Sequence, residues 1–247
     1  MASVENPSLL GSGTRVKAGA RVSGNVETGE DTLIDSNAVI SGPVKLGKRT
    51  YIGPNTVIGF PNPAQLGELV GSGKVATKPL TTLGENCVVR SGTSIYTDVK
   101  IANDVLFGHN VLVRDGVTIG EHTKLGTGVV IDGRSTIGSQ VSIQTGVYIC
   151  TYSTVEDSVF LGPCCVFTND KYVAQKPFKL IGPTVKKGAS IGANALLFPG
   201  IVVGEGAVVG AQAMVNSDIP PRKIFGGIPA RKIADVPKSW RSSLLSD

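Results

Sequence analysis

Residues 101–130 read IANDVL FGHNVL VRDGVT IGEHTK LGTGVV, and each of these six-residue units begins with a large apolar side chain. The same spacing runs through residues 10–58, 83–167 and 185–215, where 29 of 30 such positions are apolar and only Thr28 is polar. An α-helix repeats about every 3.6 residues and an ordinary strand about every two, so neither explains this period. A hexapeptide period predicts a β-helix, a solenoid of short parallel strands.

The other positions of each unit predict how the chain turns. Glycine often follows the large residue, as at Gly108, Gly120 and Gly126. A small or β-branched residue lies four positions after the large residue. Because glycine adopts cramped or left-handed backbone angles, we expect the corners at these glycines. Three units then close one triangular coil of 18 residues. About ten coils stacked at ~4.8 Å would make a prism roughly 45 Å long.

The predicted fold class is therefore all-β, a parallel β-helix of about ten coils with two inserted loops and a short C-terminal tail. We expect the β-helix to occupy residues 1–221 and the tail residues 222–247. The β-helix is nearly neutral, whereas the tail holds six basic residues against Asp235 and Asp247. Charge gathered at one end argues against a nucleic-acid-binding stripe. It predicts either a compact anionic ligand near the C-terminus or a solubilising tail. The apolar residues of segment 234–247 predict a short helix there.

Segments that would direct the chain to a membrane are missing from the sequence pattern. No apolar run is long enough to span a bilayer, and residues 1–9 do not resemble a signal peptide. The four cysteines form no CxxC pair, and we expect reduced thiols. We therefore expect a cytoplasmic protein that does not bind membranes.

Two long interruptions of the repeat, residues 59–82 and 168–184, are candidate functional segments, because long loops inside compact domains are uncommon. The first is rich in proline and glycine, with Leu66, Leu69 and Val70 as candidate anchors. The second concentrates polar residues and an aromatic one in Asn169-Asp170-Lys171-Tyr172. We interpret the second as a lid that contacts substrate; the alternative is a loop that packs against a neighbouring chain.

The chain has two histidines, and they occupy different positions of the repeat. His109 is the third residue of its unit, and the 18-residue stride places Thr127, Thr145 and Pro163 in line with it. Gln144 lies on the same face. A β-helical zinc carbonic anhydrase would need three histidine ligands, so we expect no metal site. His122 is expected to have a structural role.

The repeat region resembles the hexapeptide acyltransferases, which fold as left-handed parallel β-helices and work as homotrimers. In that family the sites lie between adjacent chains and acetyl-CoA lies along the prism. Residues 143–147, 155–163 and 168–172 are similar to the nucleotide-sugar 3-N-acetyltransferases. Residues 219–221 and 226–232 resemble the C-terminal signature of the superfamily.

The resemblance implies acetyl transfer from acetyl-CoA to the amino group of a nucleotide-linked amino-deoxysugar, with His109 as the base. It implies that the acceptor, a small-molecule nucleotide sugar, is bound by Asn110, Gln144, Asn169, Asp170, Lys171 and Tyr172. It implies that acetyl-CoA is bound by Ala193, Ala195, Ala211, Ala213, Arg231 and Lys232. Two other functions stay open: an O-acyltransferase acting on serine or a sugar hydroxyl, and a non-catalytic β-helix that serves as a scaffold subunit.

Overall fold

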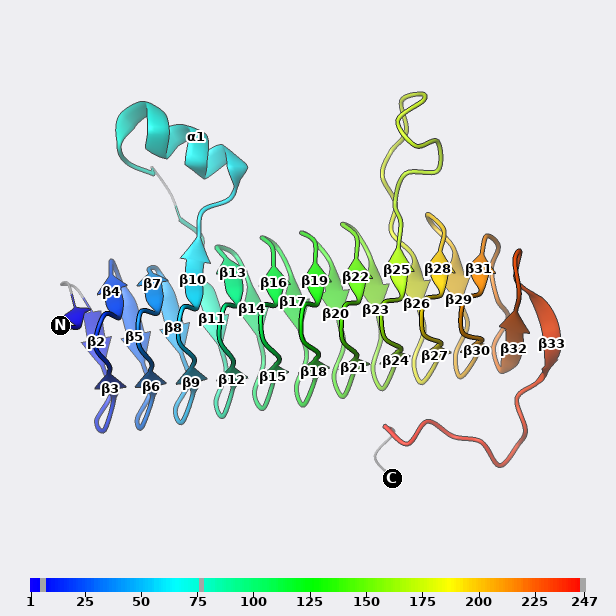
Figure 1. Cartoon of the computed structure of the whole chain (residues 1–247), viewed down its shortest axis with the longest axis horizontal. Helices are drawn as coiled ribbons and strands as arrows, with labels where there is room; N and C mark the ends of the chain where they lie inside the picture. Colours follow the sequence, from blue (N-terminus) through cyan, green and yellow to red (C-terminus); the bar gives the residue numbers. More distant parts are fainter. Residues whose placement is uncertain (5–7, 76–77, 245–247) are drawn as a thin grey trace.

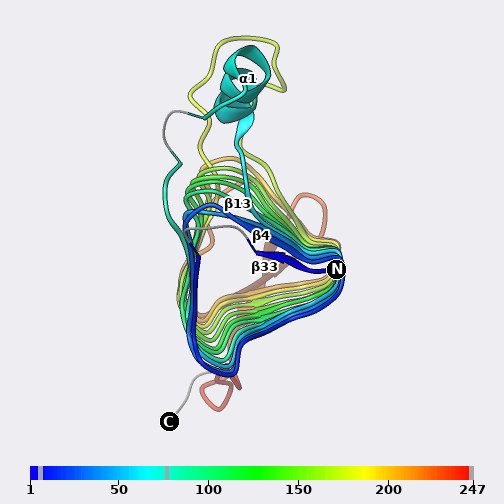
Figure 2. The ribbon, with the colours of Figure 1, turned by 90° about the vertical axis from the view of Figure 1, so that its left-hand side faces the viewer.

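The computed structural model describes residues 1–4, 8–75 and 78–244. The chain winds into a long prism with a triangular cross-section, and strands of successive coils form three sheets (Figures 1 and 2). We name the sheets A, B and C in the order in which the chain enters them. The parallel β-helix predicted from the hexads is confirmed.

Sheet A has eleven strands within the described residues: β1 (Ser3–Val4), β4 (Arg21–Ser23), β7 (Val39–Ser41), β10 (Val57–Phe60), β13 (Ser94–Tyr96), β16 (Leu112–Val113), β19 (Val130–Ile131), β22 (Tyr148–Ile149), β25 (Val166–Phe167), β28 (Leu196–Leu197) and β31 (Met214–Val215).

Sheet B has ten strands in the same described ranges: β2 (Ser8–Leu10), β5 (Val26–Thr28), β8 (Val44–Leu46), β11 (Thr81–Leu83), β14 (Lys100–Ile101), β17 (Thr118–Ile119), β20 (Thr136–Ile137), β23 (Thr154–Val155), β26 (Thr184–Val185) and β29 (Val202–Val203).

Sheet C has twelve strands among the residues described: β3 (Arg15–Val16), β6 (Leu33–Ile34), β9 (Tyr51–Ile52), β12 (Val88–Val89), β15 (Leu106–Phe107), β18 (Lys124–Leu125), β21 (Ser142–Ile143), β24 (Phe160–Leu161), β27 (Ser190–Ile191), β30 (Val208–Val209), β32 (Lys223–Gly226) and β33 (Arg231–Asp235).

Each strand pairs with the strand one coil away, and the apolar hexad residues stack in register. Val113, for example, lies opposite Ile131, 18 residues further along the chain. These residues fill the interior, and Ile95, Ile131 and Ile149 have no exposed surface. Leu10 is 37% exposed and differs from the pattern because it lies in the first coil, which has no coil on its other side to cover it.

The corners turn at a different position from the one predicted. The glycines that follow the large residue lie against the backbone of the next coil: a Cβ on Gly108 would lie 2.5 Å from the Thr127 nitrogen. Left-handed backbone angles instead occur three residues after the large one, at Asn110 (φ 55°) and His122 (φ 57°) among others. Asparagine tolerates this conformation better than most residues, so Asn110 has a structural reason for its position.

Both insertions leave the prism at the edge where sheet A passes to sheet B, and both stand on the same side of it (Figures 1 and 2). The first follows β10 and the second follows β25, five coils or about 24 Å further along the axis.

The first insertion contains a helix, α1 (Pro63–Ser72), that the sequence analysis did not predict. Asn62 and Gln65 form a reciprocal capping box, and Gly73 ends the helix in a left-handed conformation. Gln65 is the buried residue, and its Oε1 accepts a hydrogen bond from the Thr97 hydroxyl at 2.8 Å. The prediction of apolar anchors is wrong for Leu69 and Val70, which are 41% and 87% exposed.

The C-terminal segment continues sheet C and then turns back. β32 pairs with β30, and β33 pairs antiparallel with β32. The chain then runs back beneath the prism, where the Ser242 hydroxyl donates to the Ser158 carbonyl at 3.1 Å (Figure 1). The predicted short helix is absent from residues 234–244, and the rest of that prediction lies outside the described residues. No helix in the described part of the chain is long and apolar enough to cross a bilayer.

Candidate functional site

His109 lies on the edge where sheet C passes to sheet A, which we call the C–A corner. Its side chain is exposed, and Nδ1 is 2.8 Å from the hydroxyl of Ser91, the residue at the same position one coil earlier. The His109 backbone N–H points to the Thr127 hydroxyl at 3.4 Å. One imidazole nitrogen is therefore held by Ser91, while the other has no partner among the described residues and is open to a ligand.

A row of small residues continues from His109 along this corner toward the C-terminal end of the prism. Neighbouring coils are joined by backbone hydrogen bonds of 2.8–2.9 Å, such as Gly128 N to His109 O and Gln212 N to Ala193 O. All members of the row are exposed or partly exposed. This small-residue row comprises Thr127, Thr145, Pro163, Ala193 and Ala211. It extends five coils from His109, about 24 Å.

Two alanines predicted to contact acetyl-CoA are in the core instead. Ala195 and Ala213 have no exposed surface, because each occupies the small inward position four residues after a large one. Their side chains pack inside the prism. Ala193 and Ala211 are the two predicted alanines whose side chains lie on the surface.

The small-residue row ends beside the turn between β32 and β33. Ala230 N donates to Met214 O at 2.8 Å, and Arg231 follows at the first position of β33. Arg231 is exposed, and its Nη1 donates to the Ala230 carbonyl at 2.9 Å. Of the two predicted phosphate-binding cations, Arg231 is the one without a carboxylate partner among the described residues.

Lys232 is paired with an acid. Its Nζ lies 2.7 Å from Asp235 Oδ1, and Lys223 Nζ lies 2.8 Å from the same oxygen. Hydrogen bonds from Lys223 and Lys232 lower the pKa of Asp235 to about 2. A ligand phosphate would have to compete with this carboxylate for Lys232.

Gln144 also lies on the C–A corner, at a position where neighbouring coils have glycine. Its Nε2 donates to the Ser142 hydroxyl on the outer face of sheet C at 2.9 Å. The side chain is partly exposed, two coils from His109.

The second insertion lies on the A–B corner, so one chain does not bring it to His109. Asp170 stabilises the conformation of the loop. Its two carboxylate oxygens accept hydrogen bonds from the backbone N–H groups of Tyr172 at 2.9 Å and Ala174 at 2.7 Å. These hydrogen bonds lower the pKa of Asp170. Asn169 Nδ2 donates to the Thr151 carbonyl at 3.3 Å.

Tyr172 also makes contacts within the loop, whereas the Lys171 side chain forms no ion pair or hydrogen bond with a described residue. The Tyr172 ring meets Phe178 edge-on at 5.3 Å, and Lys176 Nζ lies 3.8 Å from the ring centroid. Lys171 is exposed. The polar loop residues therefore divide into Asn169, Asp170 and Tyr172, which shape the loop, and Lys171, which projects into solvent.

Between the two insertions the A–B corner carries a cluster that the sequence analysis missed. Tyr148 donates to Asp132, and Asp132 also pairs with Arg114 at 3.5 Å. Burial, together with the hydrogen bond to Asp132, raises the pKa of Tyr148. Arg134 Nη1 donates to the Tyr152 hydroxyl at 2.9 Å. In the sequence, the 18-residue spacing from Arg114 to Asp132 and from Arg134 to Tyr152 indicates that each pair lies in neighbouring coils.

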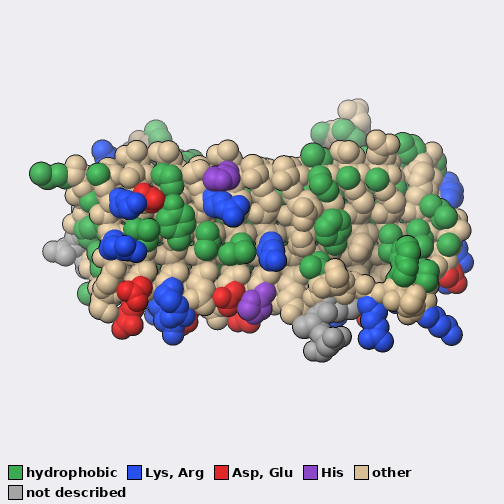
Figure 3. All heavy atoms as spheres, turned by 60° about the horizontal axis from the view of Figure 1, so that its bottom comes forward, with side chains coloured by type: hydrophobic (Ala, Val, Ile, Leu, Met, Phe, Trp, Pro, Cys, Tyr) green, Lys and Arg blue, Asp and Glu red, His purple; other side chains and the backbone are tan. Residues whose placement is uncertain are grey.

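The second histidine is remote from the first. His122 precedes β18 whereas His109 follows β15, so the two lie on opposite edges of sheet C (Figure 3). His122 Nδ1 is 3.8 Å from Asp104 Oδ2. No cluster of three or more His, Cys, Asp or Glu side chains suited to a metal ion occurs among the described residues.

Comparison with known families agrees with the repeat. The family described as "Bacterial transferase hexapeptide (six repeats)" matches residues 25–59 and 98–133, and "Hexapeptide repeat of succinyl-transferase" matches residues 186–216. The chain carries the hexapeptide repeats of these transferase families in these three stretches. This hexapeptide-repeat chain is 53% identical over 47 residues to a dTDP-3-amino-3,6-dideoxy-alpha-D-galactopyranose 3-N-acetyltransferase of Aneurinibacillus thermoaerophilus. That match covers 19% of the chain and 24% of the relative.

Other similarities of this chain are short in sequence or limited to the fold. The chain is 44% identical over 59 residues to the bifunctional protein GlmU of Rubrobacter xylanophilus, covering 24% of the chain and 13% of that protein. The chain thus spans about a quarter or less of the relatives named here. The structure of an Arabidopsis UDP-N-acetylglucosamine acyltransferase superimposes with a TM-score of 0.57 at 16% identity, over 95% of this chain and 72% of that one. This likeness concerns the fold alone.

Proposed function

We propose that the protein is an acetyl-CoA-dependent N-acetyltransferase that acts on the amino group of a nucleotide-linked amino-deoxysugar. The observation that carries the proposal is the exposed His109, held by Ser91 at 2.8 Å, at the start of the small-residue row. An oriented imidazole with one open nitrogen can accept a proton near neutral pH. The 3-N-acetyltransferase relative supports the choice of an amino sugar.

The chemistry requires one proton acceptor. The amine nitrogen attacks the thioester carbonyl carbon and passes a proton to Nε2 of His109. The carbon–sulfur bond then breaks, its electron pair leaves with sulfur, and the imidazolium returns the proton to give the free thiol of CoA. In this scheme Ser91 accepts a hydrogen bond from the Nδ1–H of His109, which leaves Nε2 unprotonated for the attack.

For the co-substrate, we place the pantetheine arm of acetyl-CoA along the small-residue row. Ala193 and Ala211 leave room for an extended chain to approach the backbone, and Arg231 at the end of the row would meet a phosphate. This arrangement directs the thioester toward His109 and the nucleotide end toward the C-terminal hairpin.

For the acceptor, the position of the second insertion implies a second chain. His109 and Lys171 lie on different edges of sheet A, so a complete site needs the A–B corner of one chain beside the C–A corner of another. A homotrimer, with three such contacts related by threefold symmetry, satisfies this requirement. The cluster of Arg114, Arg134 and Tyr152 would then lie near the acceptor as well.

The test is release of the CoA thiol from acetyl-CoA against 3-amino and 4-amino UDP- and dTDP-sugars, with serine and a hydroxyl-only sugar as comparison acceptors. Turnover restricted to an amino sugar would support the proposal. Turnover only with serine or the hydroxyl sugar would replace N-acyl with O-acyl transfer. If the protein neither binds CoA nor turns over any acceptor, the scaffold function is the better one.

A further inference from the structure

A pocket of about 410 Å³ lies beneath the returning C-terminal segment, on the edge where sheet B passes to sheet C. This B–C corner is separated from His109 and the small-residue row by the whole width of sheet C. The floor is formed by the corners at Gly188 and Gly206, and the roof by residues of the segment that follows β33. The inference below therefore does not depend on His109 or on the small-residue row.

The roof is fixed at both ends. Near β33, Val236 N donates to the Arg222 carbonyl at 2.9 Å, and Arg222 Nη2 donates to the Pro237 carbonyl at 2.9 Å. At the other end the Ser242 hydroxyl donates to the Ser158 carbonyl at 3.1 Å. Between these attachments the segment bridges the pocket without filling it.

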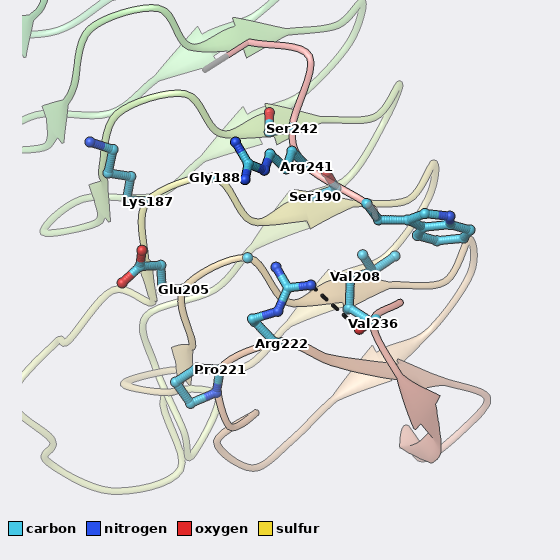
Figure 4. Close-up of a pocket in the computed structure, with 12 residues that line it drawn as sticks. Lys187, Gly188, Ser190, Glu205, Val208, Pro221, Arg222, Val236, Arg241 and Ser242 are labelled. Atoms are coloured by element: carbon cyan, nitrogen blue, oxygen red, sulfur yellow. Dashed lines mark hydrogen bonds between the residues drawn. The ribbon is translucent and has the colours of Figure 1, made fainter. Parts of the chain in front are cut away.

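Three cations line this space. Arg241 and Arg222 enter from opposite sides, and Lys187 lies at one end near Glu205 (Figure 4). None of the three cations forms an ion pair within the described part of the chain, and Glu205 is the one acidic side chain among the described residues of the lining. The described lining thus carries three cations and one carboxylate, and its net charge is positive.

The other end of the pocket is apolar. Val208 and Val236 lie away from Lys187 and Glu205 (Figure 4), and Trp240 also lines the pocket with its side chain 53% exposed. Arginine guanidinium groups bind phosphate oxygens in a bidentate geometry, and an exposed indole ring stacks on nucleobases. A ligand that joins a flat ring to a diphosphate offers a suitable group to each end of the pocket.

We propose that this pocket binds a nucleoside diphosphate group, with the base on Trp240 and the phosphates between Arg241, Arg222 and Lys187. The group could belong to a free nucleotide or to the diphosphate-bearing end of CoA, since the two share this chemistry. If it belongs to CoA, the CoA phosphates lie in this pocket and not at Arg231, where the proposed function places them. In either case the bound ligand would hold the C-terminal segment against the prism.

Trp240 is the single tryptophan of the chain, so its fluorescence reports on this pocket directly. ADP and UDP, titrated into the full-length protein, are expected to quench the emission with saturation, and adenosine is expected to bind far more weakly. Arg241→Gln and Lys187→Gln should each weaken ADP binding about tenfold or more, because each removes a charge-assisted contact to phosphate. Lys238→Ala, on the same segment but outside the lining, is the matched control and should leave binding unchanged.

An unchanged emission maximum of ligand-free Arg241→Gln would show that the segment keeps its place in that variant. CoA serves to separate the two sources: competition between CoA and ADP, with a raised KM for acetyl-CoA in Arg241→Gln, assigns the pocket to the co-substrate. Quenching by ADP without any effect on acetyl-CoA kinetics assigns it to a free nucleotide. The absence of saturable quenching by ADP and UDP at millimolar concentration, or equal affinity in Arg241→Gln, Lys187→Gln and wild type, would overturn the proposal.

Discussion

The Ser91 hydroxyl lies 2.8 Å from His109 Nδ1, and the two residues occupy the same position in successive coils. Because this hydrogen bond fixes which imidazole nitrogen is open, Ser91→Ala is expected to lower kcat about tenfold while KM for acetyl-CoA changes little. Steady-state kinetics over a range of pH would measure both values. Ser139→Ala is the matched control, because Ser139 has the same position in its unit on the B–C corner. A kcat equal to wild type in Ser91→Ala would mean that Ser91 does not position the base.

Replacing His109 itself should lower kcat more than replacing Ser91. His109→Asn is expected to lower kcat by about 10²–10⁴, the usual contribution of a general base, with the fold retained. The exposed position of the side chain makes structural damage small. The decisive measurement is the kcat of the purified variant at saturating substrates, with His122→Asn as the control that should retain activity. If His109→Asn stays fully active, the enzyme works without a protein base, and the role assigned to His109 is wrong.

The cysteines give a test of the small-residue row. Cys164 is exposed beside Pro163, whereas burial raises the pKa of Cys87 and Cys150 to about 11 and of Cys165 to about 12. The thiolate is the reactive form, so at pH 8 a thiol reagent should modify one cysteine in each native chain and four after denaturation. Acetyl-CoA should slow this modification, because it would cover the row.

The control for that experiment is Cys164→Ser, in which the fast-reacting thiol should be absent from the native protein. The raised pKa values of the buried thiols also determine how the free energy of unfolding changes with pH. Neutral buried thiols stabilise the fold below pH 9, and this contribution is lost as the pH rises from 9 toward 11, because the unfolded chain releases those protons first. Rapid modification of a second cysteine at pH 8, or no protection by acetyl-CoA, would contradict the burial or the placement of the row.

The packing of the core predicts how much stability is lost when one of its side chains is shortened. Ile131 has no exposed surface and stacks on Val113 and Ile149 in the coils on either side. Ile131→Ala is expected to lower the free energy of unfolding by about 2–5 kcal/mol through lost burial and a cavity. Thr136→Ala changes an exposed residue on sheet B and should shift the free energy of unfolding by about 0.5 kcal/mol or less. Denaturant unfolding of the two variants would measure the difference, and equal midpoints would contradict the register.

The sequence predicted the prism well because its inward position is chemically uniform: one residue in six must fill a narrow interior, from Ile34 to Val215. It did not predict α1, although the Asn62–Gln65 capping box was present, because the surrounding prolines and glycines favoured a loop. The corner conformation was also misplaced by two residues. Glycine is needed after the large residue for close packing between coils, while left-handed angles occur at residues such as Asn110.

The candidate site was harder to predict, since its parts depend on contacts between coils and on the path of the tail. His109 could be aligned with Thr127 and Thr145 from the 18-residue stride alone. The same 18-residue stride also places Arg134 in line with Tyr152, one coil further along the chain. The presence of Arg241 and Lys187 in the lining of one pocket depends on the direction in which the segment after β33 returns, and no repeat in the sequence specifies that direction.

The division of the proposed site between two corners gives the strongest test of the assembly. His109 lies on the C–A corner and Lys171 on the A–B corner, so a site shared by neighbouring chains draws one residue from each. His109→Asn chains and Lys171→Ala chains should each have reduced activity alone. Co-expressed as mixed trimers, about a quarter of their sites would combine an intact His109 with an intact Lys171, and activity should recover accordingly. Mixing the two purified proteins without exchange of chains is the control. If light scattering shows a monomer, or if co-expression restores nothing beyond the mean of the two variants, the two corners do not form one site.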